Sequence, residues 1–419
     1  MSDSLSLYIH VPFCKKKCPY CDFFSVQDLS FIPSYVKGVC KEIRLRSQPS
    51  APWSRAQVES VYLGGGTPSV LSLGQMGQIL ATVRDRFHLV PGPEITCEVN
   101  PGTVDDAYLA GLKKLGITRL SIGAQSFVPE KLSFLSRIHT REQVLDTLAG
   151  AYRAGFSNVG LDLIYGLPEE TPDIWQKDLE TALGFQVAHL SCYMLTIAPK
   201  TPFFDLCEKG LLCPCDRNLR MDFFVQASEL LENRGYTHYE VSNFALGTEN
   251  QSMHNMHYWK RGAYLGMGPS AHSFLPPDPG AGKGFQGPLQ SAPGFFHLTP
   301  RVRSWNVADV TSWLAHLASG RIPEQGRETL TPVQEVLEQV MLGLRTKNGI
   351  PIKGLDPDIH RFMARLEEQG LGRVYLPEGQ PETSRCFNLT RSGLTCLDNI
   401  VDAFAQKIFD EPHFYHNNT

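Results

Sequence analysis

Residues 7–24 read LYIHVPFCKKKCPYCDFF, in which an apolar run is followed closely by three cysteines, Cys14, Cys18 and Cys21. A short apolar run rich in β-branched and aromatic residues predicts a β-strand. The cysteines therefore begin where the first expected strand ends. Thiolates are soft ligands that suit iron–sulfur clusters, zinc or copper(I), so this spacing predicts a metal site at that strand end.

These three cysteines lack a fourth partner at a regular distance. A structural zinc site has four ligands and usually shows paired Cys-x-x-Cys elements, but no second pair follows. Another trio, on an expected loop, is irregularly spaced and is interpreted as ordinary cysteines: Cys207, Cys213 and Cys215. A [4Fe–4S] cluster normally takes four cysteines. Three would leave one iron open for a small chelating ligand, so we expect the fourth position to be reserved for a cofactor.

The composition is that of an ordinary soluble protein. Of the 419 residues, 42% are hydrophobic and 20% charged, and the net charge of -4 gives no electrostatic reason to expect nucleic acid as a partner. No run approaches the roughly 20 apolar residues that span a bilayer, and the first residues lack the pattern of a signal peptide. We therefore expect a cytoplasmic location, where the eleven cysteines stay reduced.

From residue 5 to about 235, short apolar runs alternate with amphipathic stretches. Six runs predict strands: LSLYIHV, VESVYLGGG, EITCEV, RLSIGAQS, NVGLDLIYG and HLSCYML. Five stretches between them predict helices: SYVKGVCKEIRLRS, GQMGQILATVRDRF, DDAYLAGLKKLG, REQVLDTLAGAYRAG and DIWQKDLETALGF. Repeated βα units predict an α/β fold with a parallel sheet. Six units are too few for a closed eight-fold barrel, so we expect a partial (β/α)6 TIM-like barrel over residues 1–235, with its chemistry at the carboxyl ends of the strands.

The alternation stops after residue 235, so residues 236–419 are expected to form a smaller α+β C-terminal domain. Residues 276–300 are rich in proline and glycine and predict an exposed loop. Residues 331–349 predict a helix, and residues 359–409 predict a helix, a β-hairpin and a second helix, a winged-helix-like end. This end lacks a dense Lys/Arg stripe, which favours a packing or docking role over DNA binding.

The pattern Cys-x-x-x-Cys-x-x-Cys after a first strand, with an aromatic Tyr20 before the last cysteine, resembles the signature of the radical S-adenosylmethionine (SAM) superfamily. The resemblance implies a [4Fe–4S] cluster on Cys14, Cys18 and Cys21. In that superfamily the amino and carboxylate groups of SAM bind the open iron. An electron from the cluster then cleaves SAM to a 5'-deoxyadenosyl radical.

Further motifs fall at the ends of later strands. YLGGGTPS ends the second strand at residues 62–69, and glycines allow a backbone to approach a ligand closely. Polar residues at several strand ends could orient ribose hydroxyls and a carboxylate. Together these motifs resemble the coproporphyrinogen dehydrogenase branch of the superfamily. The resemblance implies a SAM pocket formed by Tyr8, Tyr20, Gly64, Gly65, Gly66, Thr67, Glu98, Gln125, Arg137 and Asp162.

Two sub-families share this layout, namely the oxygen-independent coproporphyrinogen III oxidase and the heme chaperone called HemW. The oxidase has a further cysteine two places after the third cluster ligand, where this sequence has Phe23. The oxidase also has a long extension before its cluster motif. The segment HNMHYW at residues 254–259 resembles the H-N-x-x-Y-W segment of the chaperones, and imidazole and aromatic rings suit a porphyrin. The resemblance therefore implies heme contacts at His254, Tyr258 and Trp259.

The expected function is that of a heme chaperone that binds a [4Fe–4S] cluster, SAM and heme, and transfers heme to hemoproteins such as respiratory enzymes. The alternative is the oxidase, which decarboxylates two propionate side chains of coproporphyrinogen III to give protoporphyrinogen IX. Whether SAM is turned over stays open, and no catalytic residue is assigned. The expected partners are heme, heme-accepting proteins and an electron donor. A homodimer and a transient membrane association stay open.

Overall fold

The computed structural model describes residues 4–51, 53–276 and 301–409. Nearly all of the proline- and glycine-rich loop predicted at residues 276–300 lies outside the described residues.

The predicted alternation of strands and helices is confirmed. Six strands pair in parallel with their neighbours in chain order. They are β1 (Ser4–Val11), β2 (Gln57–Gly65), β3 (His88–Val99), β4 (Arg119–Gln125), β5 (Asn158–Tyr165) and β6 (His189–Met194). Each of the first five leads into a helix: α1 (Ile32–Arg46), α2 (Leu73–Arg86), α3 (Asp106–Lys114), α4 (Pro129–Phe134) with α5 (Arg141–Arg153), and α6 (Pro172–Leu183).

The helices form for local reasons that the sequence makes visible. Helix α2 begins at a capping box, in which the Ser72 side chain accepts from the Gln75 backbone and the Gln75 side chain accepts from the Ser72 backbone. Its buried residues include Met76, Ile79 and Leu80, which share one face at helical spacing. That face packs on the sheet and contributes to one continuous apolar core.

The sheet extends beyond the six strands on both sides. β9 (Ala263–Met267) pairs in parallel with β1, and β10 (His272–Leu275), β11 (Val302–Asn306) and β12 (Glu324–Thr329) follow it. Beyond β6 lie β8 (Asn243–Ala245) and β7 (Thr237–Glu240). The sheet of twelve strands ends at β12 and β7 without closing, which confirms an open, partial barrel. The domain boundary at residue 235 stays a prediction, since the strands that follow it extend this same sheet.

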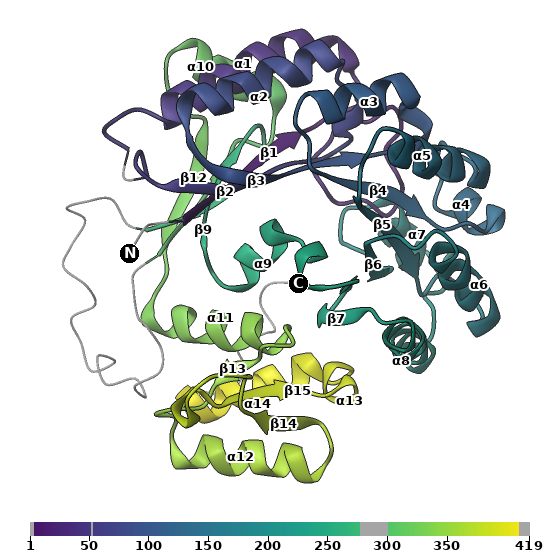
Figure 1. The fold of residues 1–419 in the computed structure, drawn as a ribbon, viewed down its shortest axis with the longest axis vertical. Helices are drawn as coiled ribbons and strands as arrows, with labels where there is room; N and C mark the ends of the chain where they lie inside the picture. The colour runs from purple at the N-terminus through teal and green to yellow at the C-terminus, as the bar shows by residue number, and fades with distance from the viewer. Residues whose placement is uncertain (1–3, 52, 277–300, 410–419) are drawn as a thin grey trace.

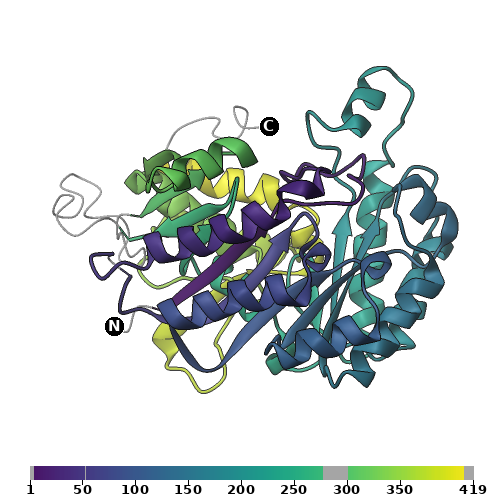
Figure 2. The same cartoon turned by 90° about the horizontal axis from the view of Figure 1, so that it is seen from above.

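Figure 1 shows helices α1, α2, α3, α5 and α6 outside the curved sheet. Helix α8 (Arg217–Asn233) packs on α6, and α10 (Val310–Ala318) packs on α1. The short helix α9 (Met253–Trp259) lies on the opposite, concave side. In Figure 2, the teal segment that contains α7 (Pro202–Glu208) projects beyond the rest of the barrel.

The C-terminal part has its own small core. A three-stranded sheet contains β13 (Ile350–Pro351), β15 (Cys386–Leu389) and β14 (Gly372–Tyr375). Around it lie α11 (Pro332–Leu344), α12 (Pro357–Glu368), α13 (Arg391–Leu394) and α14 (Leu397–Phe409). The predicted order of helix, hairpin and helix is confirmed, and Phe387 and Phe404 are buried at its centre. Within the described ranges, no helix has the length and apolar character needed to cross a bilayer.

Candidate cofactor site

A cavity of about 420 Å³ lies at the carboxyl ends of β2 to β6 and is also lined by the loop that follows β1. All three cysteines of that loop line the cavity: Cys14 is buried, and Cys18 and Cys21 are partly buried. The loop is held by backbone hydrogen bonds from Cys14 to the Val26 carbonyl (3.0 Å) and from Val26 to the Pro12 carbonyl (2.7 Å). The strand order thus delivers three thiols to the place where parallel barrels carry their chemistry.

Among the described residues, no three His, Cys, Asp or Glu side chains converge to hold a single metal ion. A [4Fe–4S] cluster differs from such a site because each thiolate binds a different iron of the cluster.

The glycines at the end of β2 bring this strand close to the cysteine loop. The Gly66 amide donates to the Val11 carbonyl (2.8 Å), and a Cβ atom at Gly66 would lie 2.8 Å from the Phe13 carbonyl oxygen. The Thr67 hydroxyl lies 3.6 Å from the Cys14 sulfur. Gly65, Gly66 and Thr67 line the cavity. Gly64 lies behind it, where a Cβ atom would meet the Tyr62 ring at 2.7 Å.

We expect Gly66→Ala to lower the free energy of unfolding by about 1–3 kcal/mol, the usual cost of overpacking. The added methyl group would press on backbone atoms that have little freedom to move. Urea unfolding of the apoprotein measures the loss. Gly74→Ala in α2 is the matched control, because its nearest neighbour would lie 4.0 Å away and alanine favours a helix. Equal stability of the two variants would contradict the close approach at Gly66.

Two carboxylates face the cavity from β3 and β5, the strands on either side of β4. Glu98 accepts hydrogen bonds from the Tyr62 hydroxyl (2.9 Å) and the Gly65 amide (3.1 Å). Asp162 accepts from the Ser121 hydroxyl (3.1 and 3.0 Å). Burial, aided by the nearby Asp162, raises the pKa of Glu98 to about 7. Burial also raises the pKa of Asp162. Two carboxylates in a site that disfavours their charge would be stabilised by a cationic ligand.

A cation lies on the other side of the same cavity. Arg137 donates to the Cys18 sulfur (3.4 Å) and to the Gly123 carbonyl (3.0 Å). Its Nε atom is buried and has no hydrogen-bond partner in the described structure. Gln125 adopts a left-handed conformation (φ 65°) at the end of β4, and Tyr20 packs against Phe203 of α7. Three thiols, a guanidinium and two carboxylates fit a cluster together with a ligand that carries an amino group, a carboxylate and a positive charge, as SAM does.

The other residues predicted from the sequence lie outside the cavity. The Tyr8 hydroxyl bonds His10 (3.2 Å), and the Tyr8 ring lies against Tyr62, with ring centroids 6.1 Å apart. On α9, His254 is 1% exposed, and its two ring nitrogens bond the Ser60 hydroxyl (2.8 Å) and the Tyr258 hydroxyl (2.7 Å).

His254 is held in its neutral form behind the cavity wall. Burial lowers the pKa of His254 to about 3. Its ring stacks on Tyr62, with centroids 4.9 Å apart, and Tyr62 itself lines the cavity. Trp259 is partly buried at the end of the same helix. The candidate heme segment therefore lies next to the cofactor cavity, and both ring nitrogens of His254 already have hydrogen-bond partners.

The sequence analysis missed several residues that line the cavity, among them Tyr62, Ser121 and Tyr193. Side chains two positions apart in a strand share a face. Tyr62 and Ser121 therefore face the same side as Gly64 and Gln125, which had been identified. Counting back along each strand in twos from Gly64 and Gln125 could have found Tyr62 and Ser121.

Residues 8–182 match the family model of the radical SAM superfamily. The chain is similar to a "Heme chaperone HemW" of Synechocystis, with 34% identity over 350 residues that cover 82% of this chain and 78% of that protein. It is 32% identical to a "Heme chaperone HemW" of Lactococcus lactis over 95% of this chain and 97% of that protein. Among solved structures, the coproporphyrinogen III oxidase HemN of Escherichia coli has a similar fold. Its TM-score is 0.72 at 20% identity, over 97% of this chain and 91% of that one.

Proposed function

The chain belongs to the heme chaperone HemW family within the radical SAM superfamily, and from this premise we propose that it binds a [4Fe–4S] cluster, SAM and heme, and passes the heme to other hemoproteins. The proposal rests above all on the cavity that gathers three thiols, a guanidinium and two carboxylates.

Each group in the cavity has a role in the proposal. Cys14, Cys18 and Cys21 would hold the cluster. Glu98 would accept a hydrogen bond from the amino group of SAM, and Arg137 would pair with the carboxylate of SAM, which has the opposite charge. When bound, the cluster and SAM supply one-electron chemistry. The contribution of the chain is to hold and orient both groups and to surround them with buried strand ends.

The remaining residues proposed as SAM contacts from the family resemblance fall into two groups, those that line the cavity and those that lie behind its lining. Tyr20, Gly65, Gly66, Thr67, Gln125 and Asp162 line it, whereas Tyr8 and Gly64 support residues that do. The hydroxyl groups of the ribose would be oriented by the polar side chains at the ends of β4 and β5.

We retain the segment of His254, Tyr258 and Trp259 as the proposed heme contact. Both ring nitrogens of His254 have partners, so heme binding there requires α9 to release this side chain. No axial ligand is assigned. The proposed partners are heme-accepting hemoproteins and an electron donor. The proposed location is the cytoplasm, whose reducing conditions suit the eleven free cysteines.

A heme titration of the anaerobically reconstituted protein tests the proposal. We expect the Soret band to grow and saturate at one heme per chain, and a coproporphyrinogen III assay to yield no protoporphyrinogen IX. Phe23, in place of the additional cysteine of the oxidase, motivates the second expectation. Failure to saturate would contradict the chaperone. Rescue of a strain that lacks the oxidase would favour the alternative activity, the oxidative decarboxylation of coproporphyrinogen III.

A further inference from the structure

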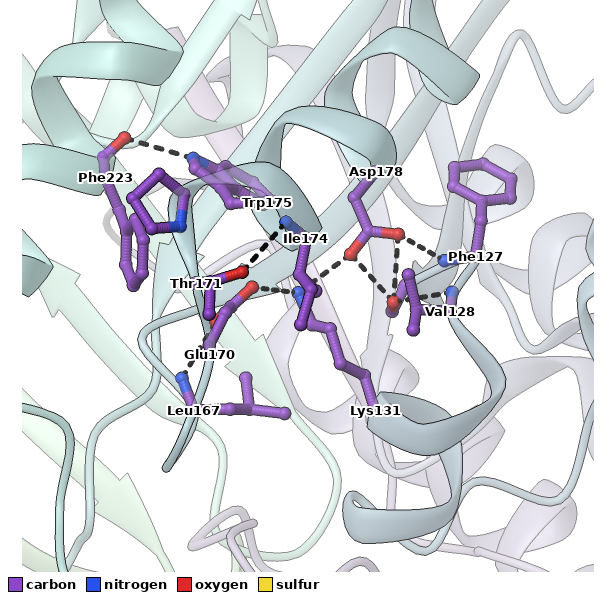
Figure 3. Close-up of polar contacts among 12 residues, drawn as sticks. Phe127, Val128, Lys131, Leu167, Glu170, Thr171, Ile174, Trp175, Asp178 and Phe223 are labelled. Atoms are coloured by element: carbon purple, nitrogen blue, oxygen red, sulfur yellow. Dashed lines mark hydrogen bonds and ion pairs between the residues drawn. The ribbon is translucent and has the colours of Figure 1, made fainter.

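A buried group of three charges lies outside the cofactor cavity (Figure 3). The Lys131 ammonium group contacts Glu170 Oε1 (2.5 Å) and Asp178 Oδ2 (2.7 Å). The lysine side chain is 6% exposed and both carboxylates are fully buried. None of the three residues lines the cavity, so the proposed function has not used them.

The two carboxylates also bind backbone from two neighbouring loops. Asp178, on α6, accepts from the Ser126 hydroxyl (2.9 and 2.7 Å) and from the Phe127 amide (2.6 Å), at the turn after β4. Glu170 accepts from the Leu167 amide (2.9 Å), in the loop after β5. The ion group therefore joins the loop after β4 to the loop after β5, and Figure 3 shows Glu170 and Asp178 both in contact with the Lys131 ammonium group.

A short, closely bonded stretch of chain leads from Lys131 to Arg137. Lys131 lies on α4, and its carbonyl accepts from the Leu135 amide (2.9 Å). The Arg137 amide then donates to the Leu132 carbonyl (2.9 Å). Because Leu132 and Leu135 are buried, this turn is also fixed by packing. The backbone of Arg137 is thus set relative to the ion group, and its guanidinium extends to Cys18 and Gly123.

Burying these charges is costly. Replacement of a buried ion pair by apolar residues of similar size is often neutral or stabilising. One lysine also faces two carboxylates here, which leaves a net negative charge. Stability alone therefore does not account for this buried ion group, whereas a role in fixing the direction of the Arg137 side chain does.

We propose that Lys131 is a positioning residue for the cofactor site: with Glu170 and Asp178 it holds the segment from Gln125 to Arg137 so that the guanidinium meets the Cys18 sulfur and the cavity. This inference rests on the proposed function. Hydrogen bonds to the cluster sulfurs are among the factors that set its reduction potential. The Arg137 guanidinium beside Cys18 would favour the reduced, more negative cluster, and it would also pair with the carboxylate of SAM.

Lys131→Met in the full-length, reconstituted protein tests the inference through the reduction potential of the cluster and the dissociation constant of SAM. Lys131→Met, like Arg137→Gln, should shift the reduction potential to more negative values. It should also raise the SAM dissociation constant about tenfold, which is a usual size of coupling between residues of one network. If Lys131 acts through Arg137, the double variant should match Arg137→Gln alone. Additive effects, or wild-type values in Lys131→Met, would overturn the inference.

Breaking a buried ion pair can prevent folding. Glu170→Gln leaves Asp178 as a partner for Lys131, so it serves where Lys131→Met fails to fold. Glu170→Gln should change the reduction potential and the SAM dissociation constant in the same direction as Lys131→Met, but by less. In the Arg137→Gln background it should have no effect. Additive effects, or wild-type values in Glu170→Gln, would overturn the inference. Lys114→Met, at an exposed position on α3, is the control and should keep wild-type values. A wild-type protein that binds neither cluster nor SAM would instead refute the proposed function.

Discussion

Replacement of any one of Cys14, Cys18 and Cys21 by alanine is expected to abolish the iron–sulfur cluster. All three thiols line one cavity, and each would bind a separate iron, so the loss of one would leave a second iron without its thiolate. The absorption of the reconstituted protein at about 400 nm, which comes from thiolate-to-iron charge transfer, should disappear together with the bound iron and sulfide. This is the largest effect that the structure predicts for a single substitution.

Cys213→Ala is the matched control for this prediction. Cys213 is exposed and follows α7, outside the cavity. The variant should therefore keep the full iron and sulfide content and the full absorption. A complete cluster in any of the three alanine variants, or its loss in Cys213→Ala, would refute the assignment of the ligands.

Glu98→Gln should weaken SAM binding by more than about 100-fold, because removing one partner of a buried charge pair costs about 3–5 kcal/mol. In the cavity, Tyr62 and Gly65 hold the Glu98 carboxylate, whose negative charge would attract the sulfonium cation SAM. Isothermal titration of the reconstituted protein with SAM at pH 8 measures the loss. Glu142→Gln, at an exposed position on α5, should bind SAM as the wild type does.

The same carboxylate predicts a dependence of SAM binding on pH. Since burial raises the pKa of Glu98 to about 7, the neutral form dominates below pH 7 in the empty cavity. The positive charge of SAM, a sulfonium compound, selects the ionised form, so the affinity should be full above pH 7 and fall about tenfold for each pH unit well below it. Glu98→Gln should lose this dependence between pH 7 and pH 6. A wild-type pH profile in that variant would show that another group titrates.

The six βα units could be predicted because parallel strands that are buried on both faces read as apolar runs. The strands that extend the sheet beyond these six could not be predicted from the sequence. β9 pairs with β1 although more than 200 residues separate them, and its sequence AYLGM gives no sign of that partner. Pairing over such distances is decided by the packing of the whole chain.

Most of the residues predicted for the cofactor site line one cavity, because they stand at strand ends and parallel strands bring their ends together. The surroundings of His254 could not be predicted in this way. Its burial depends on Ser60 and Glu94, which lie on β2 and β3 and bond its ring and its backbone amide (2.8 and 3.0 Å). Residue type indicates what a histidine can bind, whereas distant strands decide whether its nitrogens are free.

The most direct test of the central claim, a three-cysteine cluster with one iron open to SAM, is the electron paramagnetic resonance spectrum of the reduced, reconstituted protein before and after SAM is added. We predict four irons and four sulfides per chain, and a spectrum that changes until one SAM is bound per cluster. An unchanged spectrum, or a protein that takes up only a single tetrahedral zinc ion, would contradict the claim.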